Sequence, residues 1–387
     1  MILSVIILSY NTRELLEQCL NSVINSLSCH PDPIPKRYGA NESQDLLSAL
    51  TQIPDPASPA GGQVRNDGLQ AHHSNPSSPH PGSFSLHPDS FSCHPESSSR
   101  HPDSLSCHPE SSSRHPDESQ DLPSAEIIVV DNHSQDDSVE MLENLKFKIK
   151  NLKLKIIVNN DNLGFAKANN QGIKESRGKY ILLLNSDTIV KDKALEKMVS
   201  YLEENPQVGG VSPLLLNADG SAQIDYYMRF PNLWQIFFYH NRLLRPLAMK
   251  SPLVNLICFP VKKVPYPVDQ LPGAAMMARR KVWQKVGLLD EDYPFYFEDV
   301  DWAWRAKKMG QKLMVLPQAE IIHLGGGSWK KGKARPEEYY RQFFASMAIF
   351  LKKNYPPFKR EIMLAAIKAN LGLKEFIKKI LRKTKSA

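Results

Sequence analysis

The segment Tyr180–Leu184 (YILLL) is a continuous apolar run that stops abruptly at Asn185-Ser186-Asp187. A run of this length, closed by a turn signal, is typical of a strand buried on both faces of a parallel sheet. Open α/β sheets bind ligands just outside the carboxyl ends of such strands. Asp187 is therefore placed to hold a cation beside a phosphate, although Asn, Ser and Asp can equally form an ordinary turn here.

Strands and helices alternate along most of the chain. Aliphatic runs that suit buried strands occur at Leu3–Leu8, Glu126–Val130 and Leu154–Val158, besides the run described above. Apolar residues at helical spacing follow, at 15–27, 137–145, 165–176 and 194–204. This alternation predicts an α/β fold with a mainly parallel sheet, right-handed crossovers and helices on its flanks.

Residues 28–124 interrupt this pattern between the first helix and the second strand. They hold 15 of the 29 prolines and nine of the 12 histidines, and they include the near-identical units SFSCHPESSSRHPD and SLSCHPESSSRHPD. Such a segment cannot bury enough apolar surface to offset its ordering entropy, so we predict a disordered low-complexity insertion. Its Cys-His pairs lack the closed spacing of a zinc site. The predicted domains are a discontinuous catalytic domain (1–27 plus 125–330), the insertion (28–124) and a basic helical extension (331–387).

Cysteine usage and hydropathy bear on the compartment. The five cysteines show no disulfide framework, which favours a reducing compartment. The N-terminal MILSVIILSYN lacks the basic region and cleavage site of a signal peptide, and no apolar run reaches transmembrane length. We therefore expect a cytoplasmic protein, either soluble or peripheral at the cytoplasmic face of the membrane.

The C-terminal region carries most of the positive charge. Residues 330–387 hold 16 Lys and Arg against four Asp and Glu. Within 361–383 an apolar helix face is predicted, formed by Leu373, Phe376, Ile377, Ile380 and Leu381. Such a helix can lie on an anionic membrane surface, or it can pack on the catalytic domain and leave its basic face in solvent. No nucleic-acid-binding motif accompanies the charge, so we expect no nucleic-acid partner. The apolar stretch 233–260 can either cover an acceptor or form core.

Polar clusters follow three of the predicted strands, at Tyr10-Asn11, Asp131-Asn132 and Asn185-Ser186-Asp187. In a parallel sheet these ends meet at one edge, which predicts a ligand pocket there. Asp131 can accept hydrogen bonds from a base or a sugar hydroxyl. Amide and glycine residues, including Asn162, Gly164 and Asn170, surround a predicted helix start, where backbone N–H groups favour phosphate. The alternative is that Asn162 and Gly164 only cap that helix.

A second group of polar residues lies in FYFEDVDWAWR at 295–305, where Glu298, Asp299 and Asp301 sit among aromatic side chains. Burial and like-charged neighbours raise a carboxylate pKa, which suits a general base. The same acids are also typical of a helix N-terminus. His323 ends another aliphatic run; it is either an ordinary buried histidine or a ligand beside a carboxylate-bound cation.

Seven segments occur in the order found in glycosyltransferase family 2, which the chain resembles. They are SVIILSYN, EIIVVDN, NLGFAKANNQG, YILLLNSD, LPGAAMMARRKVWQKVGLLDE, YFEDVDWAWRAKKMG and AEIIHLGGGS. The resemblance is nearest to the rhamnosyltransferase-like branch and covers residues 1–27 and 125 to about 355. It implies the GT-A fold, in which one α/β domain binds a nucleotide-sugar and a divalent metal.

The resemblance also implies roles for individual residues. Asp187 matches the metal ligand of the family's Asp-any-Asp motif, whose first position is Asn185 rather than Asp here, and His323 matches a position that completes metal binding in some members. Tyr10 and Asp131 match contacts to the nucleotide base. Asp299, next to Glu298, matches the catalytic base. Two further residues, Trp302 and Arg305, match the segment that lines the acceptor site.

The implied reaction is inverting transfer of rhamnose or another hexose from a nucleotide-diphosphate sugar, with Mg²⁺ or Mn²⁺, in cell-surface polysaccharide synthesis. The expected acceptor is a saccharide or a lipid-linked saccharide. A nucleotidyltransferase is the alternative enzyme, but SYNTREL lacks the Gly-rich basic loop that it needs. A catalytically silent nucleotide-sugar-binding scaffold is the alternative outside enzymes.

Overall fold

The computed structural model describes residues 2–27, 125–149, 152–241, 244–325 and 336–385. These residues belong to one compact unit, which comprises 1–53 and 119–387; a second unit, 54–118, lies outside the described residues. The predicted disordered insertion, 28–124, therefore cannot be compared with the structure.

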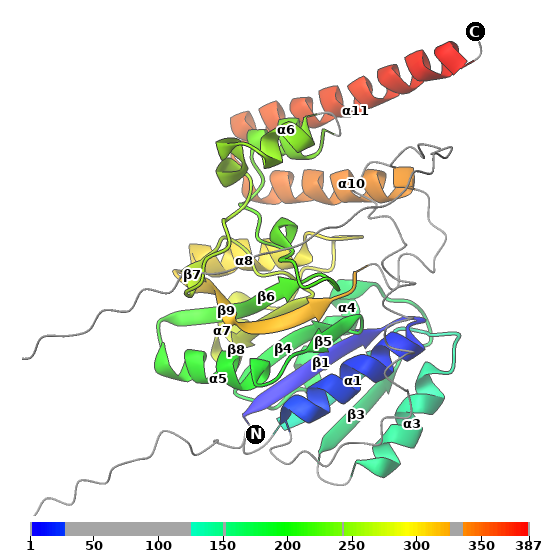
Figure 1. The fold of residues 1–387 in the computed structure, drawn as a ribbon, viewed down its shortest axis with the longest axis vertical. Coiled ribbons are helices and arrows are strands. Elements are labelled where there is room, and N and C mark those ends of the chain that lie inside the picture. The colour runs from blue at the N-terminus through cyan, green and yellow to red at the C-terminus, as the bar shows by residue number, and fades with distance from the viewer. Residues whose placement is uncertain (1, 28–124, 150–151, 242–243, 326–335, 386–387) are drawn as a thin grey trace, which may run out of the picture. The chain divides into compact units, whose positions relative to one another are not determined.

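The centre of the described unit is a nine-stranded sheet with the order β3-β2-β1-β4-β8-β6-β9-β5, in which β7 pairs with β9 (Figure 1). The strands are β1 (Leu3–Ser9), β2 (Ala125–Asp131), β3 (Lys153–Val158), β4 (Tyr180–Asn185), β5 (Thr188–Val190), β6 (Val208–Leu216), β7 (Tyr266–Pro267), β8 (Ala275–Arg279) and β9 (Lys312–His323).

Strand direction divides the sheet into two parts. Strands β3, β2, β1 and β4 are parallel to one another, whereas β8 runs antiparallel to both β4 and β6. Strand β9 is parallel to β6 and antiparallel to β5. The predicted α/β class is confirmed, and the parallel part contains all four strands that the sequence predicts. Because β8 is reversed, its beginning lies at the same edge as the end of β4.

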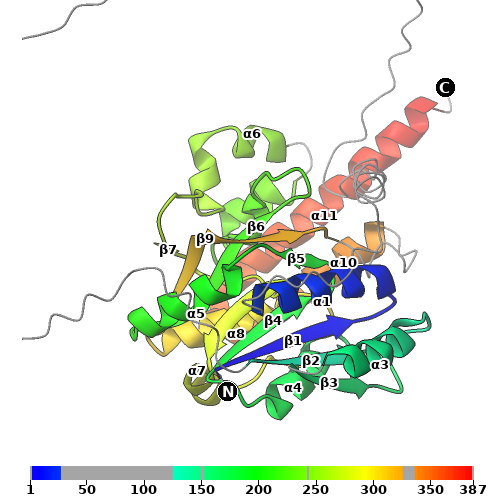
Figure 2. The ribbon, with the colours of Figure 1, turned by 60° about the horizontal axis from the view of Figure 1, so that its bottom comes forward.

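Helices cover both faces of the sheet (Figures 1 and 2). Contacts place α1, α3 and α5 together on one face, whereas α4 packs on β1 and β2 and α7 packs on β8 and α8. The helices are α1 (Arg13–Leu27), α3 (Ser138–Lys148), α4 (Phe165–Glu175), α5 (Ala194–Glu204), α6 (Arg245–Met249), α7 (Arg280–Val286), α8 (Glu298–Lys308), α10 (Pro336–Asn354) and α11 (Pro357–Lys385).

Burial follows the sequence pattern closely. Four residues of β4, Ile181–Leu184, are at most 1% exposed, as expected for a strand covered on both faces. On α1 the buried side chains recur at helical spacing: Leu16, Cys19, Leu20, Val23 and Ile24. Helix α4 approaches β1 at Gly172, where an added Cβ would lie 2.4 Å from Cγ2 of Ile6. Glycine therefore permits this close helix–sheet contact.

The stretch between β6 and β7 forms short helical segments. Besides α6, they are η1 (Ile224–Tyr226), η2 (Gln235–Tyr239) and η3 (Pro252–Leu256). The apolar residues of 233–260 divide between two roles. Ile236, Ile257 and Cys258 are buried, whereas Trp234, Phe237 and Leu247 are 46%, 46% and 65% exposed.

Helices α10 and α11 build a second apolar cluster with η2 and the segment before α8. Phe350, Met363 and Ile367 are buried in it with Phe297, and Nδ2 of Asn370 donates to the carbonyl of Ile236 at 2.6 Å. The first half of α11 is thus packed on neighbouring elements. The predicted apolar face at 373–381 lies outside the described side chains. No helix in the described part of the chain is long and apolar enough to cross a membrane.

Candidate active site at the strand ends

Register brings the three polar strand ends together. Ser9 at the end of β1 pairs with Asp131 at the end of β2, and Leu8 pairs with Asn185 at the end of β4. The residues that follow, Tyr10-Asn11 and Ser186-Asp187, therefore leave the sheet at the same edge. Hydroxyl groups join the loops after β1 and β4, because Oγ1 of Thr12 lies 2.9 Å from Oγ of Ser186.

The loop after β1 and the loop after β2 hold each other in place. Asn11, with φ of 52°, receives a hydrogen bond on Oδ1 from the backbone N–H of Gln135 at 2.6 Å and donates its own N–H to Oγ of Ser134 at 2.9 Å. The N–H of Ser134 donates to Oδ1 of Asp131 at 2.9 Å. The other oxygen of Asp131, Oδ2, is buried without a hydrogen-bond partner among the described residues. A buried carboxylate oxygen in that state can accept an N–H or O–H from a ligand.

Asn162 and Gly164 shape the loop that precedes α4. Oδ1 of Asn162 accepts hydrogen bonds from Nδ2 of Asn132 at 2.8 Å and from the N–H of Gly164 at 3.0 Å. Gly164 has φ of 80°, which favours glycine. Asn132 is central here, because its Oδ1 also accepts from Asn159 and from the N–H of Leu163. These contacts match the alternative in which the two residues organise the helix start.

The side-chain amide of Asn170 is used in hydrogen bonds to the segment after α7. Its side chain is 1% exposed, its Nδ2 donates to the carbonyl of Leu289 and to Oε1 of Glu291, and its Oδ1 accepts from the N–H of Leu289. This amide ties α4 to the segment after α7, and the ligand contact of Asn170 stays a prediction. The sequence could not reveal a partner 119 residues away.

His323 reaches Asp187 through strand pairing. Thr188 pairs with His323 across β5 and β9, and this puts Nε2 of the imidazole 3.4 Å from Oδ1 of Asp187. Nδ2 of Asn185 lies 3.5 Å from the same nitrogen. Both His323 and Asp187 are less than a tenth exposed. The structure thus brings together the two residues predicted to hold a metal.

The donor set at this point fits a divalent cation. On the other side of the ring, Nδ1 of His323 lies 3.1 Å from Oε1 of Gln223, an arrangement that leaves Nε2 as a lone-pair donor facing a carboxylate. Metal-binding histidines commonly donate their second ring N–H to an oxygen in this way. Among the described residues no group of three or more His, Cys, Asp or Glu gathers around one point. Asp187 and His323 would thus supply only part of a coordination shell.

Asp299 is held by backbone N–H groups at the start of α8. Gly273 donates to its Oδ2 at 2.8 Å, and Val300 donates to its Oδ1 at 2.8 Å. The turn before the helix is tight, with φ of 61° at Tyr296 and 75° at Phe297. Burial raises the pKa of Asp299, while the two donors oppose that shift. The carboxylate is therefore positioned, and it keeps two further lone-pair sites for a proton or a ligand.

Glu298 differs from its neighbour in environment. It is 5% exposed, and no Lys or Arg of the described residues lies within ion-pair distance of it. Burial, followed by the charge of Asp299, raises the pKa of Glu298 to about 8. At neutral pH Glu298 therefore tends to keep its proton, and Asp299 is the member of the pair that ionises.

The two halves of the candidate site are linked through the beginning of β8. The N–H of Asn185 donates to the carbonyl of Ala274 at 3.0 Å, and the next residue back, Gly273, donates to Asp299. A Cβ on Gly273 would lie 3.2 Å from Cζ of Phe165 and 3.3 Å from Oδ2 of Asp299. The reversed direction of β8 thus places Asp299 at the edge that carries Asp187.

Trp302 and Arg305 have structural contacts. Trp302 is fully buried, its ring centroid lies 4.5 Å from that of Trp283, and its Nε1 donates to the carbonyl of Gly287. The guanidinium of Arg305 donates to Asp301 and to the carbonyls of Val286 and Leu288. The ring of Trp302 has no exposed surface, and Arg305 holds the turn after α7. The implied acceptor contacts of both residues stay predictions.

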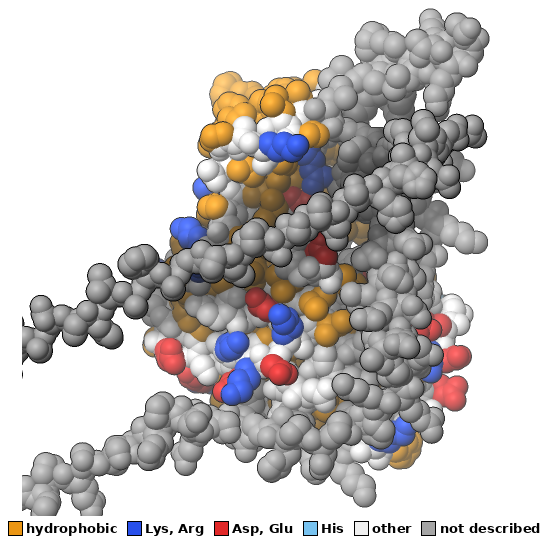
Figure 3. All heavy atoms as spheres, viewed as in Figure 1, with side chains coloured by type: hydrophobic (Ala, Val, Ile, Leu, Met, Phe, Trp, Pro, Cys, Tyr) orange, Lys and Arg blue, Asp and Glu red, His pale blue; other side chains and the backbone are white. Residues whose placement is uncertain are grey.

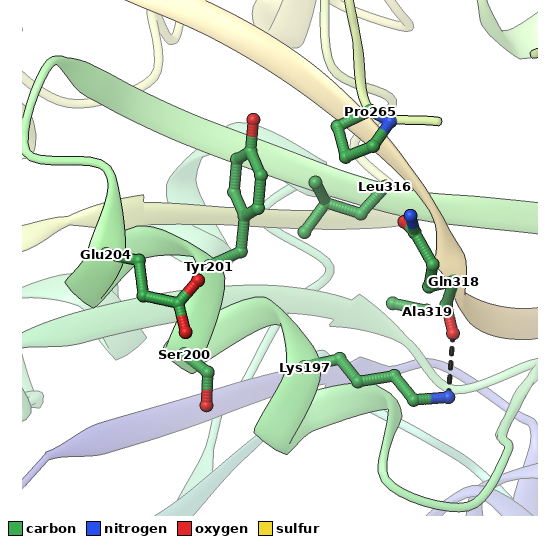
Figure 4. Close-up of a pocket in the computed structure, with 8 residues that line it drawn as sticks. All are labelled: Lys197, Ser200, Tyr201, Glu204, Pro265, Leu316, Gln318 and Ala319. Atoms are coloured by element: carbon green, nitrogen blue, oxygen red, sulfur yellow. Dashed lines mark hydrogen bonds between the residues drawn. The ribbon is translucent and has the colours of Figure 1, made fainter. Parts of the chain in front are cut away.

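A separate hollow lies where α5 meets the middle of β9 (Figure 4). Its lining includes Lys197 and Tyr201 of α5 with Leu316 and Gln318 of β9, and Nζ of Lys197 donates to the carbonyl of Gln318 at 2.8 Å. None of the strand-end residues lines it. We therefore assign the candidate site to the strand ends, which carry the buried Asp131 and Asp187 and are linked to Asp299 through Gly273 and Ala274.

Sequence reasoning missed three residues that organise the site: Thr12, Gly273 and Gln223. Each acts through a partner far along the chain, at Ser186, Asp299 and His323 respectively. Gly273 carries a weak local signal, because LPGAA precedes a predicted strand. The other two carry none.

A family model confirms the resemblance seen in the sequence. The model described as Glycosyl transferase family 2 matches residues 118–250. The chain carries a domain of glycosyltransferase family 2. With the sheet order, this match confirms the GT-A fold implied by the seven segments.

Two curated relatives extend the likeness at low identity. An uncharacterised glycosyltransferase of Haemophilus influenzae is 26% identical over 195 residues, which cover 50% of this chain and 54% of that protein. The N-acetylglucosaminyl-diphospho-decaprenol L-rhamnosyltransferase of Mycobacterium tuberculosis (strain CDC 1551 / Oshkosh) is 24% identical over 199 residues, which cover 51% of this chain and 63% of that protein. The match thus spans less than two thirds of either relative.

Among solved structures, a mannosyltransferase from Pyrobaculum calidifontis in complex with GDP-Man and Mn²⁺ is similar. The superposition has a TM-score of 0.47 at 12% identity, and it covers 96% of this chain and 74% of that chain. At that TM-score the likeness carries no argument about ligand or chemistry.

Proposed function

We propose that this chain is an inverting glycosyltransferase that uses Asp299 as its general base. The observation that carries the proposal is the placement of Asp299: backbone N–H groups hold both oxygens, burial raises its pKa, and β8 links it to the edge with Asp187. A base in this position removes the proton of an acceptor hydroxyl as that oxygen attacks the anomeric carbon. The bond from that carbon to the diphosphate breaks in the same step.

A single base suffices for this reaction. Direct displacement inverts the anomeric carbon and forms no covalent enzyme intermediate, so a second nucleophilic carboxylate is not needed. Glu298, with its raised pKa, would stay protonated and would avoid placing a second negative charge beside Asp299. The proton from the acceptor is received by Asp299, and the negative charge departs on the nucleoside diphosphate.

The donor would bind across the other strand ends. The unpartnered Oδ2 of Asp131 would accept an N–H of the nucleotide base, with Tyr10 and Asn11 beside it. Ser186, already joined to Thr12, would lie next to the phosphates. Asp187 and His323 would hold Mg²⁺ or Mn²⁺, which when bound supplies positive charge that stabilises the departing diphosphate.

Rhamnose is the proposed sugar, with another hexose as the alternative within the same chemistry. The support is the resemblance to the rhamnosyltransferase-like branch and the similarity to a mycobacterial protein named as an L-rhamnosyltransferase. That name also contains a lipid-linked saccharide, which supports a saccharide or lipid-linked acceptor in cell-surface polysaccharide synthesis. A cytoplasmic position at the membrane face follows from such an acceptor.

The apolar face over η2 and α6 supports a peripheral membrane contact. Hydrophobic side chains gather over α6 at the top of Figure 3, and the exposed ones include Trp234, Phe237 and Leu247. Phe358, at the start of α11, is 81% exposed. Aromatic and aliphatic side chains beside a basic C-terminal helix suit an anionic bilayer surface.

Donor turnover tests the proposal directly. The full chain is assayed for release of nucleoside diphosphate from a panel of nucleotide-sugars, with and without Mn²⁺, and with a lipid-linked saccharide as acceptor. We expect release from at least one donor, dependent on the cation and increased by acceptor. Binding of donors without any release would favour the scaffold alternative, and release of pyrophosphate from a nucleoside triphosphate and a sugar phosphate would favour the nucleotidyltransferase.

A further inference from the structure

A chain of polar side chains runs from the turn after β6 to the imidazole of His323. Backbone hydrogen bonds hold this turn. The N–H of Gly220 donates to the carbonyl of Asn217, and the N–H of Asn217 donates to the carbonyl of Ser221. The N–H of Gln223 donates to the carbonyl of Leu215. Four of its side chains are joined in series: Asp219, Ser221, Asn217 and Gln223. The direction of each hydrogen bond can be deduced from the groups at the ends.

At the far end, a carboxylate fixes the direction. The hydroxyl of Ser221 donates to Oδ1 of Asp219 at 2.6 Å, and this bond lowers the pKa of Asp219. The only hydroxyl hydrogen of Ser221 is thereby used, so its Oγ must accept from Asn217. Nδ2 of Asn217 donates to it at 2.9 Å, which turns Oδ1 of Asn217 toward Gln223.

At the near end, a backbone carbonyl fixes the amide of Gln223. Its Nε2 donates to Oδ1 of Asn217 at 2.8 Å and to the carbonyl of His323 at 2.7 Å, and neither acceptor can donate. Oε1 of Gln223 therefore faces Nδ1 of His323, 3.1 Å away. Because an amide oxygen only accepts, Nδ1 must carry the ring hydrogen.

The hydrogen on Nδ1 determines the state of the other ring nitrogen, Nε2. In a neutral imidazole with hydrogen on Nδ1, Nε2 carries the lone pair, and this atom lies 3.4 Å from Oδ1 of Asp187 and 3.5 Å from the amide nitrogen of Asn185. The ring of Tyr226 packs edge-on against the imidazole, with 5.1 Å between centroids, and limits its rotation. A lone pair facing a carboxylate is favourable only when a positive or hydrogen-bearing group lies between or beside them.

We infer that Gln223 is a positioning residue that selects the Nδ1–H tautomer of His323 and so presents Nε2 to a divalent cation shared with Asp187. The inference rests on the proposed function for the identity of the cation. The tautomer itself is a property of the free protein. Asp219, Ser221 and Asn217 act through Gln223 by fixing the direction of its amide.

The tautomer is measured by nitrogen-15 NMR of the full chain labelled at histidine, recorded above about pH 8 where imidazole is neutral. His323→Asn assigns the signal among the 12 histidines. We expect the Nδ1–H pattern in the wild type. In Gln223→Met, which keeps the size but removes the acceptor, the pattern should shift toward the Nε2–H tautomer.

Cation affinity supplies a second readout. Free Mn²⁺ is followed by electron paramagnetic resonance during titration of each variant. Loss of an outer-shell partner of a metal-binding histidine typically weakens affinity about 10–100-fold, which we expect for Gln223→Met. Gln235→Met is the matched control, because Gln235 also donates through its amide to two backbone carbonyls, at Arg229 and Ile257, away from His323.

An Nε2–H pattern in the wild type would overturn the inference, as would an unchanged pattern and Mn²⁺ affinity in Gln223→Met. Failure of the proposed function looks different. If the wild type shows the expected tautomer but turns over no donor, the role of Gln223 in selecting the tautomer stands and the proposed glycosyl transfer is refuted. If the wild type does not bind Mn²⁺, the proposed cation site is refuted. The NMR pattern alone then tests whether Gln223 selects the tautomer of His323.

Discussion

At the scale of single residues, the pair Glu298 and Asp299 shows how two adjacent carboxyls acquire different behaviour. Asp299 has two backbone N–H donors that stabilise its anion, whereas Glu298 is buried beside that anion. The surroundings of the two carboxyls, and not their residue types, therefore make Asp299 the group that ionises and Glu298 the group that keeps its proton. The acids in FYFEDVDWAWR were predicted as a catalytic group from the sequence. The donor from Gly273, which distinguishes the two, was not predictable because it comes from 26 residues earlier.

Glu298 should make folding stability depend on pH. Its folded pKa of about 8 lies above its ordinary value of 4.5, so between these values the folded state binds more protons than the unfolded state. Stability contributed by the protonated form is present below about pH 4.5 and is lost as pH rises toward 8. Glu298→Gln, which cannot ionise, should therefore gain stability relative to the wild type as pH rises.

We expect this gain, measured by thermal unfolding at pH 5 and at pH 8, to be on the order of 3 kcal/mol, because each pH unit between the two pKa values changes the free energy of unfolding by about 1.4 kcal/mol; the melting temperature should rise by several degrees. Glu291→Gln serves as a control at an exposed acid. A melting-temperature difference for Glu298→Gln that is the same at both pH values would show that Glu298 has no raised pKa in the folded protein.

At the scale of elements, the reversed strand β8 determines where the base lies. Its beginning meets the end of β4, so Gly273 and Ala274 connect Asp299 to Asn185. The sequence predicted the parallel strands and the edge at which their polar residues meet, because aliphatic runs and turn residues are local signals. It could not predict the partners of Asn170 and Trp302. Their roles depend on burial and on partners brought together only by the complete fold.

Gly273→Ala tests this connection. The added methyl would meet Phe165 and Oδ2 of Asp299 at 3.2–3.3 Å, so one of them must shift. Because a displacement of about 1 Å can cost 10²-fold in rate, we expect kcat to fall about 10–100-fold with little change in KM for the donor. Steady-state kinetics measures both. Gly372→Ala on α11 is the control, since nothing lies within 4 Å of its added Cβ; equal kcat in the two variants would refute the role of Gly273.

At the scale of the whole molecule, the described unit combines a polar strand-end edge with an exposed apolar face. Segments on both sides of 28–124 contribute to one sheet, since β1 pairs with β2. The discontinuous catalytic domain remains a prediction, and the insertion between its parts lies outside the described residues. Under the proposed function, the apolar face over η2 and α6 would contact the bilayer that holds a lipid-linked acceptor.

Membrane association can be tested with the full chain and vesicles. We expect sedimentation with vesicles rich in anionic lipid, and weaker sedimentation with zwitterionic ones. The double variant Trp234→Ser with Phe237→Ser should lower binding at least about 10-fold, because each ring contributes about 1.5–3 kcal/mol when buried. Phe147→Ser is the control on α3, where the side chain is 80% exposed. Equal losses in both variants would argue against a specific membrane face.

The central claim is that Asp299 is the base of a glycosyl transfer, and Asp299→Asn tests it most directly. Donor binding is measured by calorimetry and transfer by product formation with the best donor from the panel. The account predicts donor affinity within about threefold of the wild type, since the amide keeps the shape of the carboxyl, and a loss in kcat of about 10²–10⁴-fold or more. Turnover at the wild-type rate in Asp299→Asn would contradict it.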